Sequence, residues 1–122
     1  GILAGFVCYH ATVFLKQRLK VDDSLDVFPV HGVGGALGTL LAAVFASAGL
    51  GVFSGQGLAE GMTIASQFQV QLIGVLASGV YTAIVTFVLL KLIDRMLGLR
   101  VSQDEETEGL DLTQHNERGY DL

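Results

Sequence analysis

The sequence predicts an all-α fold, a partial polytopic membrane helix bundle of about three transmembrane helices followed by a polar tail. Residues 27–59 and 62–90 contain no Asp, Glu, Lys or Arg, and 51% of the 122 residues are apolar. A helix that crosses a bilayer needs roughly 20 apolar residues, and both stretches exceed that length. A soluble domain would instead carry charges on the outer face of each helical turn. We therefore expect a transmembrane helical region over 1–97 and a tail over 98–122.

The first helix is expected over about 1–19. It ends in Lys16, Arg18 and Lys20, cations that suit both the carboxyl end of a helix and lipid head groups. Its apolar segment is already under way at the first residues, without an initiator Met, which predicts that the sequence is a piece of a longer protein. The single cysteine, Cys8, cannot form a disulfide within the chain.

The second helix is expected over about 26–49. Asp23 and Asp26 lie in the short loop before it, where a carboxylate can accept hydrogen bonds from the first amide groups of a helix. Pro29 has no N–H group and fits only the first helical turn. This favours Asp26 as the cap and Val27 as the first helical residue.

The third helix is expected over about 62–97, with Gly98 as its stop. At about 1.5 Å per residue it is longer than the roughly 30 Å hydrocarbon layer. It should therefore tilt or begin outside the hydrocarbon. The tail that follows is polar, acidic and poor in aromatic residues, so we expect it to be mobile unless something docks it.

The basic residues predict the orientation. They fall in two regions that an even number of crossings places on the same side, whereas the loop 49–66 has none. These residues are Lys16, Arg18, Lys20, Lys91, Arg95, Arg100 and Arg118. By the positive-inside rule the tail is cytoplasmic. The net charge of -5 excludes nucleic acid as an expected partner.

His31 is an ionisable residue within an otherwise uncharged spanning helix. Such a residue usually faces a bundle interior or a water-filled path. Gly32, Gly34, Gly35 and Gly38 follow it, and each glycine weakens a helix by about 1 kcal/mol relative to alanine. One explanation is close packing of a neighbouring helix, across which the imidazole forms a hydrogen bond.

The other explanation is a narrow conduit, and periodicity alone leaves both open. Val27, His31, Gly35 and Gly38 lie on one helix face, at spacings of four, four and three. That face could line the conduit. His10, within an apolar run, is expected to pack or to hydrogen-bond between helices.

Two motifs resemble the ammonium transporter (Amt/Rh) family. The stretch VDDSLDVFPVHGVGGALGTLLAAVFA closely resembles the tenth membrane helix of that family, and GLRVSQDEETEGLDLTQHNERGY resembles its cytoplasmic C-terminal region. The resemblance covers essentially all of the chain. It implies eleven helices in the whole protein, of which this chain holds the end of the ninth, the tenth, the eleventh and the tail.

The resemblance implies transport of ammonium or ammonia across the cell membrane, by a multi-pass homotrimer with one hydrophobic pore per subunit. His31 matches the second of two pore histidines, and the first is absent from this chain. Val27 matches an apolar pore-lining position, whereas Asp23 and Asp26 match the cytoplasmic mouth or cap the helix. Pro29 stands where many relatives have Gly. No catalytic residue, metal or cofactor is expected, so the chain is not expected to be an enzyme.

The resemblance also gives the tail a regulatory role, as part of the surface where a PII-type signalling protein docks. The residues that match the tail pattern are Arg100, Glu108, Gly109, Leu110, Asp111 and Tyr120. Asn116 stands where relatives often have Gly. The alternative function is an ammonium sensor that uses the same fold and signals through this tail.

Overall fold

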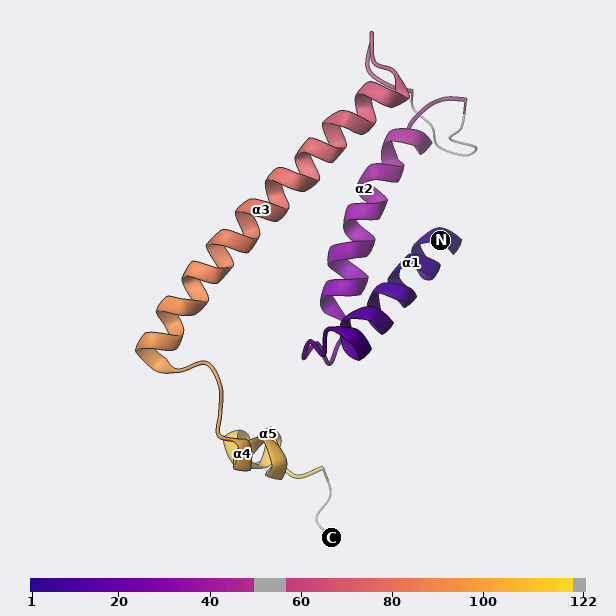
Figure 1. The fold of residues 1–122 in the computed structure, drawn as a ribbon. Coiled ribbons are helices and arrows are strands. Elements are labelled where there is room, and N and C mark those ends of the chain that lie inside the picture. The colour runs from indigo at the N-terminus through magenta and orange to yellow at the C-terminus, as the bar shows by residue number, and fades with distance from the viewer. Residues whose placement is uncertain (50–56, 120–122) are drawn as a thin grey trace. The chain divides into compact units, whose positions relative to one another are not determined.

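The computed structural model describes residues 1–49 and 57–119, and within them every regular element is helical. The elements are α1 (Ile2–Val13), η1 (Phe14–Arg18), η2 (Phe28–Val33), α2 (Gly34–Phe45), α3 (Ile64–Leu97), α4 (Gln103–Glu108) and α5 (Leu110–His115) (Figure 1). η1 and η2 are single π-helical turns that continue directly into or out of an α-helix. The prediction of an all-α fold is confirmed.

The chain divides into two compact units, Gly1–Gly79 and Val80–Leu122, with the division inside α3. In the first unit, α1 with η1 and η2 with α2 form a helical hairpin around a short polar loop (Figure 1). The inner side of α1 and η1 carries mostly small residues at helical spacing, and these are only partly exposed: Ala4, Val7, Cys8 and Ala11 in α1, and Leu15 in η1. Small side chains let two helix backbones approach closely in an apolar environment.

The facing side of the second helix is where the hairpin has its small core. Pro29 is fully buried and Ala43 has no exposed surface. Gly34 lies directly against α1, because a Cβ atom added there would stand 3.0 Å from Sγ of Cys8. The second helix, expected over 26–49, runs in the structure from Phe28 through η2 and α2 to Phe45.

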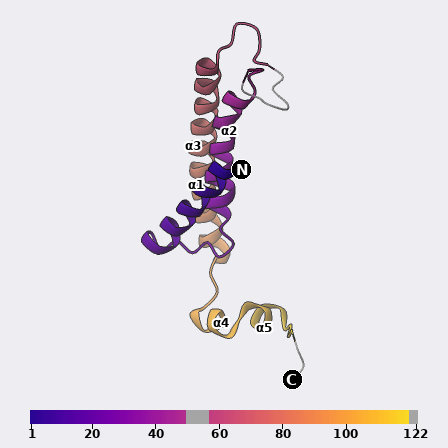
Figure 2. The same ribbon diagram turned by 90° about the vertical axis from the view of Figure 1, so that its right-hand side faces the viewer.

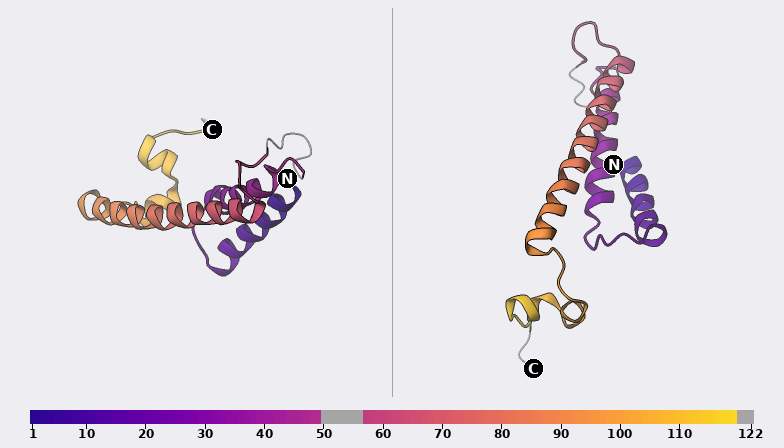
Figure 3. Two further views of the ribbon diagram at one scale, coloured as in Figure 1. Left: turned by 90° about the horizontal axis from the view of Figure 1, so that it is seen from above. Right: turned by 60° about the vertical axis from the view of Figure 1, so that its left-hand side comes forward.

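α3 is a single helix of 34 residues, unbroken in both views of Figure 3. Thr63 and Ser66 form a reciprocal cap at its amino end. The Thr63 hydroxyl oxygen accepts from the Ser66 amide at 3.1 Å, and the Ser66 hydroxyl oxygen accepts from the Thr63 amide at 2.9 Å. Gly98 ends it with φ +77°, a conformation that glycine adopts at no steric cost. α3 was expected over 62–97.

Two helical segments are long and apolar enough to cross a membrane, Phe28–Phe45 and Ile64–Leu97. At 1.5 Å per residue, the 34 residues of α3 correspond to about 51 Å, which exceeds a hydrocarbon layer of about 30 Å. α1 and η1 together are shorter than a full span. Within the described residues, α3 has no buried residue of its own.

The tail contains two short helices, α4 and α5, joined at Gly109 (Figure 2). The sequence predicted a tail that is mobile unless something docks it, and did not predict these two helices. Gly109 has φ +107° and both ends α4 and precedes α5. Asn116 ends α5 in the left-handed conformation, with φ 52°. Asparagine tolerates this conformation better than other non-glycine residues. Asn116 can therefore end the helix at a position that also suits glycine.

Candidate functional site

The carboxylate of Asp23 caps the amino end of the second helix. Oδ1 of Asp23 accepts a hydrogen bond from the Val27 amide at 2.9 Å, and Oδ2 accepts one from the Phe28 amide at 2.8 Å. These bonds hold the pKa of the Asp23 carboxyl below its ordinary value, with the Phe28 amide as the larger cause. The loop sequence favoured Asp26 as the cap, but in the structure the Asp23 carboxylate accepts these capping bonds.

Asp26 has a different structural role. Its backbone is in the left-handed region, with φ 55°, and its carboxylate lies 2.7 Å from Nζ of Lys16. This ion pair connects the last turn of η1 to the residue before the second helix. It is partly solvated, since the side chains of Lys16 and Asp26 are 40% and 33% exposed. The capping prediction was wrong for Asp26 because its carboxylate turns towards Lys16.

The first turn of the second helix is a π-helical turn, and it contains both Pro29 and His31. Pro29 lies within the first two helical positions. An N–H group there has no acceptor within the helix, so proline loses no hydrogen bond. π-helical turns occur frequently at functional sites. The sequence pattern predicted regular α-helical spacing here, so this π-helical turn was not predicted.

The face that carries His31 is uncovered within the described residues. His31, Gly35 and Gly38 are exposed, and Val27 is 52% exposed. A Cβ atom added at Gly35 or Gly38 would meet nothing within 4 Å. Across residues 1–49 and 57–119, the imidazole of His31 has no hydrogen-bond partner.

The glycines around His31 divide into two groups. A Cβ atom at Gly34 would stand 3.0 Å from Cys8 Sγ, and one at Gly32 would stand 3.1 Å from the Phe28 ring of its own helix. Gly35 and Gly38 have open space beside them. Close helix packing therefore explains Gly34 in this hairpin, whereas no contact in the described chain explains Gly35 and Gly38. Gly34 and Gly38, which are four residues apart, therefore do not form one packing surface against α1.

Sequence reasoning missed the partner of Gly34, which is Cys8. The signal was available in the small residues of α1 at spacings of three and four, which predict one packing face. His10 lies outside this face and is exposed. Its ring instead contacts that of Phe6, with centroids 4.4 Å apart in an edge-on arrangement, and that of Tyr9 at 5.4 Å.

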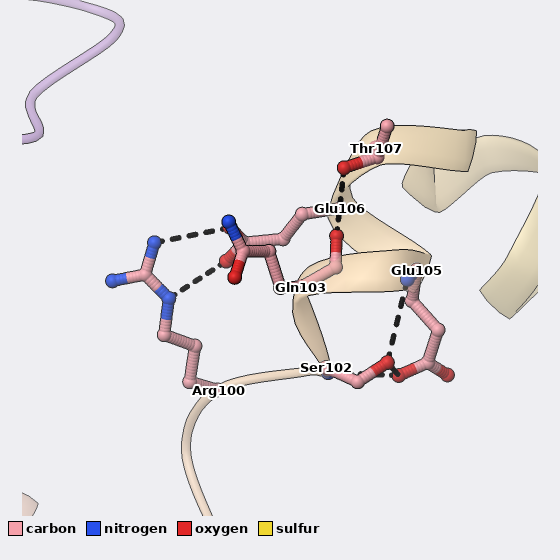
Figure 4. Close-up of polar contacts among 6 residues, drawn as sticks. All are labelled: Arg100, Ser102, Gln103, Glu105, Glu106 and Thr107. Atoms are coloured by element: carbon pink, nitrogen blue, oxygen red, sulfur yellow. Dashed lines mark hydrogen bonds and ion pairs between the residues drawn. The ribbon is translucent and has the colours of Figure 1, made fainter.

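The tail residues form a second polar site, shown in Figure 4. Nε of Arg100 donates to Oε1 of Glu106 at 2.7 Å, and a second guanidinium nitrogen donates to Oε2 at 3.1 Å. Two parallel bonds of this kind fix the geometry of both side chains. The hydrogen bonds from Arg100 lower the pKa of the Glu106 carboxyl.

α4 begins with a reciprocal cap between Ser102 and Glu105. The Ser102 hydroxyl accepts from the Glu105 amide at 3.3 Å, and Oε2 of Glu105 accepts from the Ser102 amide at 2.9 Å and from its hydroxyl at 2.8 Å. Oε1 of Glu105 accepts from Nε2 of the Gln114 side chain at 3.0 Å, and this bond connects α4 to α5. Hydrogen bonds from Ser102 lower the pKa of the Glu105 carboxyl. The Ser-x-x-Glu spacing that predicts this cap is present in the sequence.

The remaining tail candidates do not gather into one site. Glu108 is exposed, Gly109 makes the turn between the helices, and Leu110 is 47% exposed. The backbone carbonyl of Asp111 accepts the Glu117 amide at 2.9 Å. Tyr120 lies outside the described residues. Among the described residues, no group of three or more His, Cys, Asp or Glu side chains could hold a metal ion.

Comparisons with known proteins match nearly the whole chain. The family model described as Ammonium Transporter Family matches residues 1–120. The chain is 44% identical over 123 residues to a relative from Methanothermobacter thermautotrophicus. This match covers 100% of the chain and 30% of the relative. It is 38% identical over 120 residues to an ammonium transporter of Bacillus subtilis and, over the same length, 38% identical to ammonium transporter Amt1 of Archaeoglobus fulgidus. Each of these two matches covers 98% of this chain and 29% of the relative.

The chain therefore spans about a third of the length of the curated relatives it matches. The relatives from Bacillus subtilis and Archaeoglobus fulgidus are named as transporters. These names agree with the expectation that the chain is not an enzyme.

Proposed function

The chain belongs to the ammonium transporter family, and from this membership we propose that the protein conducts ammonium across the cell membrane through a hydrophobic pore lined in part by His31. The pore face consists of Val27, His31, Gly35 and Gly38. A second histidine, from a part of the protein outside this chain, faces His31 across the pore. The whole protein is a homotrimer with one pore in each subunit.

The observation that carries this proposal is the uncovered face around His31. Its imidazole has no hydrogen-bond partner among the described residues, and Gly35 and Gly38 leave open space beside it. An ionisable side chain in an apolar spanning helix is costly unless it faces a bundle interior or a conduction path. Glycine at these two positions keeps that path free of side chains.

Imidazole suits this role. In its neutral form it has one hydrogen-bond donor and one acceptor, so it can bind NH3 or pass a proton along a pair of rings. An apolar lining removes water from NH4+ and disfavours the passage of K+, which has no proton to give up. Val27, one turn before His31, supplies part of that lining.

Asp23 contributes by holding the start of this helix. Its two hydrogen bonds go to the amides of Val27 and Phe28, the residues that begin the pore face. Fixing these amides fixes where the Val27 side chain and the next turn, with His31, lie. Asp23 and the Lys16–Asp26 ion pair would then stand at the cytoplasmic mouth of the pore.

We place the tail on the cytoplasmic side, following the positive-inside rule. Its regulatory residues Arg100, Glu108, Gly109, Leu110, Asp111 and Tyr120 form part of the surface for a PII-type signalling protein. The bidentate bond between Arg100 and Glu106 supports this, because it gives the tail a fixed local structure on which a partner could dock.

The test is uptake of labelled methylammonium by the full-length protein in cells. We expect His31→Ala to reduce uptake sharply, since the pore then loses one of its two hydrogen-bonding rings. His10→Ala is the matched control, because it removes an exposed histidine from α1, outside the pore face. Unchanged uptake in His31→Ala, or an equal loss in His10→Ala, would contradict the pore assignment.

A further inference from the structure

The uncovered face of the second helix is wider than the row of Val27 and His31. It also contains Phe28, which is 60% exposed, and Gly32, which is exposed as well. Residues four apart lie above one another on a helix surface, so Phe28 and Gly32 form a second row directly beside the first. The aromatic ring of Phe28 therefore lies next to the turn that carries His31.

Gly32 makes room for the Phe28 ring on the helix surface. A Cβ atom added at Gly32 would stand 3.1 Å from Cδ2, 3.3 Å from Cε2 and 3.6 Å from Cγ of Phe28. The first two distances are shorter than an ordinary van der Waals contact, which begins at 3.4 Å. Because glycine has no side chain, the edge of the ring can approach the backbone closely here. Any other residue at this position would push the ring away from the helix.

Asp23 holds the backbone at the base of the same side chain. Its carboxylate accepts hydrogen bonds from the Val27 amide at 2.9 Å and from the Phe28 amide at 2.8 Å. The cap thus fixes the backbone of Phe28, while the missing side chain of Gly32 decides where the ring lies. Two separate features of the helix start therefore keep an apolar ring beside His31.

We propose that the Phe28 ring forms one side of the pore at the level of His31 and sets the largest alkylammonium ion that passes, and that Gly32 holds the ring in this position. This inference rests on the proposed function, because it needs conduction along the His31 face. A phenyl ring has no hydrogen-bonding group, so this side of the pore leaves the imidazole as the polar partner of the substrate. Phe28 is thus a specificity-determining residue.

The test is uptake of labelled methylammonium and ethylammonium by the full-length protein in proteoliposomes, after subtraction of uptake by empty liposomes. The ratio of the two rates does not depend on the folded fraction, since unfolded molecules transport neither ion. We expect Phe28→Ala to raise the ratio of ethylammonium to methylammonium by about tenfold, the scale on which a fitted site discriminates one methylene group. Phe14→Ala is the matched control, because it removes a phenylalanine that is 54% exposed from η1. Its ratio should equal that of wild type.

Gly32→Ala tests whether Gly32 holds the ring. The new methyl group meets the ring edge at 3.1 Å and displaces it from the helix surface into the pore, so methylammonium uptake should fall. Adding Phe28→Ala should restore uptake, because the methyl group then has no ring to displace. A competing explanation is that the ring only packs against a helix outside this chain. That explanation predicts a lower melting temperature for Phe28→Ala and an unchanged ratio of the two substrates.

Three outcomes would overturn this inference alone, provided that His31→Ala loses uptake of both ions. One is an unchanged substrate ratio in Phe28→Ala, and another is an equal rise of the ratio in Phe14→Ala. The third is no recovery of uptake when Phe28→Ala is added to Gly32→Ala. Normal uptake by His31→Ala would instead remove the proposed function, and this inference with it. If thermal melting shows that Phe28→Ala does not fold, Phe28→Leu replaces it, with a smaller rise expected.

Discussion

The second helix and the acidic tail differ in whether their polar side chains have hydrogen-bond partners within the described chain. In the tail, Ser102, Glu105 and Gln114 satisfy one another, and Arg100 pairs with Glu106. In the second helix, the carboxylates of the loop are bonded, but the imidazole of His31 has no partner in the described chain. Since a polar group in an apolar setting is costly without a partner, we predict that His31 meets a partner outside the described residues.

The glycines of the second helix also differ in whether the described chain gives them a neighbour: Gly34 has one and Gly35 has none. Substitutions at these two positions have the largest expected effects. Gly35→Leu should reduce methylammonium uptake to the level of His31→Ala, because the new side chain fills the open space on the pore face. The hairpin should still form, since a Cβ atom there meets nothing within 4 Å. Uptake and the thermal melting of the full-length protein in detergent measure the two effects separately.

Gly34→Leu is the matched control for that prediction. It should destabilise the protein by about 1–3 kcal/mol, the usual cost of overpacking, because a Cβ atom at Gly34 already stands 3.0 Å from Cys8 Sγ. Cys8→Ala should partly rescue Gly34→Leu and leave Gly35→Leu unchanged. If Gly35→Leu transports normally, or melts as early as Gly34→Leu, the division of the glycines into a packing group and a pore group fails.

A smaller effect is expected in the tail. Ser102→Ala removes the hydroxyl that caps α4 and should weaken that helix by about 1 kcal/mol. Hydrogen–deuterium exchange of the full-length protein should show faster exchange in peptides covering 103–108. Thr107→Val is the control, because the Thr107 hydroxyl donates to the Gln103 carbonyl within the helix and takes no part in the cap. Equal exchange in wild type and Ser102→Ala would show that the cap does not stabilise α4.

The fold class and the family could be predicted from sequence because both rest on features that survive without the rest of the protein. Uncharged stretches predict spanning helices whatever packs against them, and Gly98 could be identified as a stop because glycine adopts a positive φ at no cost. The membership of the ammonium transporter family is confirmed. The role of His31 in a pore stays a prediction.

Other features could not be predicted because they depend on which of several similar groups makes a contact. Asp23 and Asp26 both suit a helix cap, and the choice was decided by Lys16, which pairs with Asp26 across the hairpin. The glycine-rich stretch left close helix packing and a conduit both open, and in the hairpin only Gly34 meets Cys8. The tail helices had a readable signal in Ser102 and Glu105, which the acidic composition of the segment obscured.

The smallest expected effect concerns acid at the start of the second helix. The folded-state pKa of Asp23 lies below its ordinary value of 3.8, because two amides donate to the ionised carboxylate. The stabilisation is therefore fully present above about pH 4 and is lost as the pH falls through the lowered pKa. Amide exchange at Val27 and Phe28, corrected for its intrinsic pH dependence, should accelerate only below that range.

Asp23→Asn should remove this acid dependence, because a carboxamide has one acceptor oxygen and does not titrate. The Val27 and Phe28 amides should then exchange faster than in wild type already at neutral pH, and at a rate that no longer responds to acid. Asp104→Asn, a substitution in the tail, should leave both amides as they are in wild type. If Asp23→Asn keeps the acid response, the Asp23 carboxylate is not the group that couples this helix start to acid, and the prediction fails.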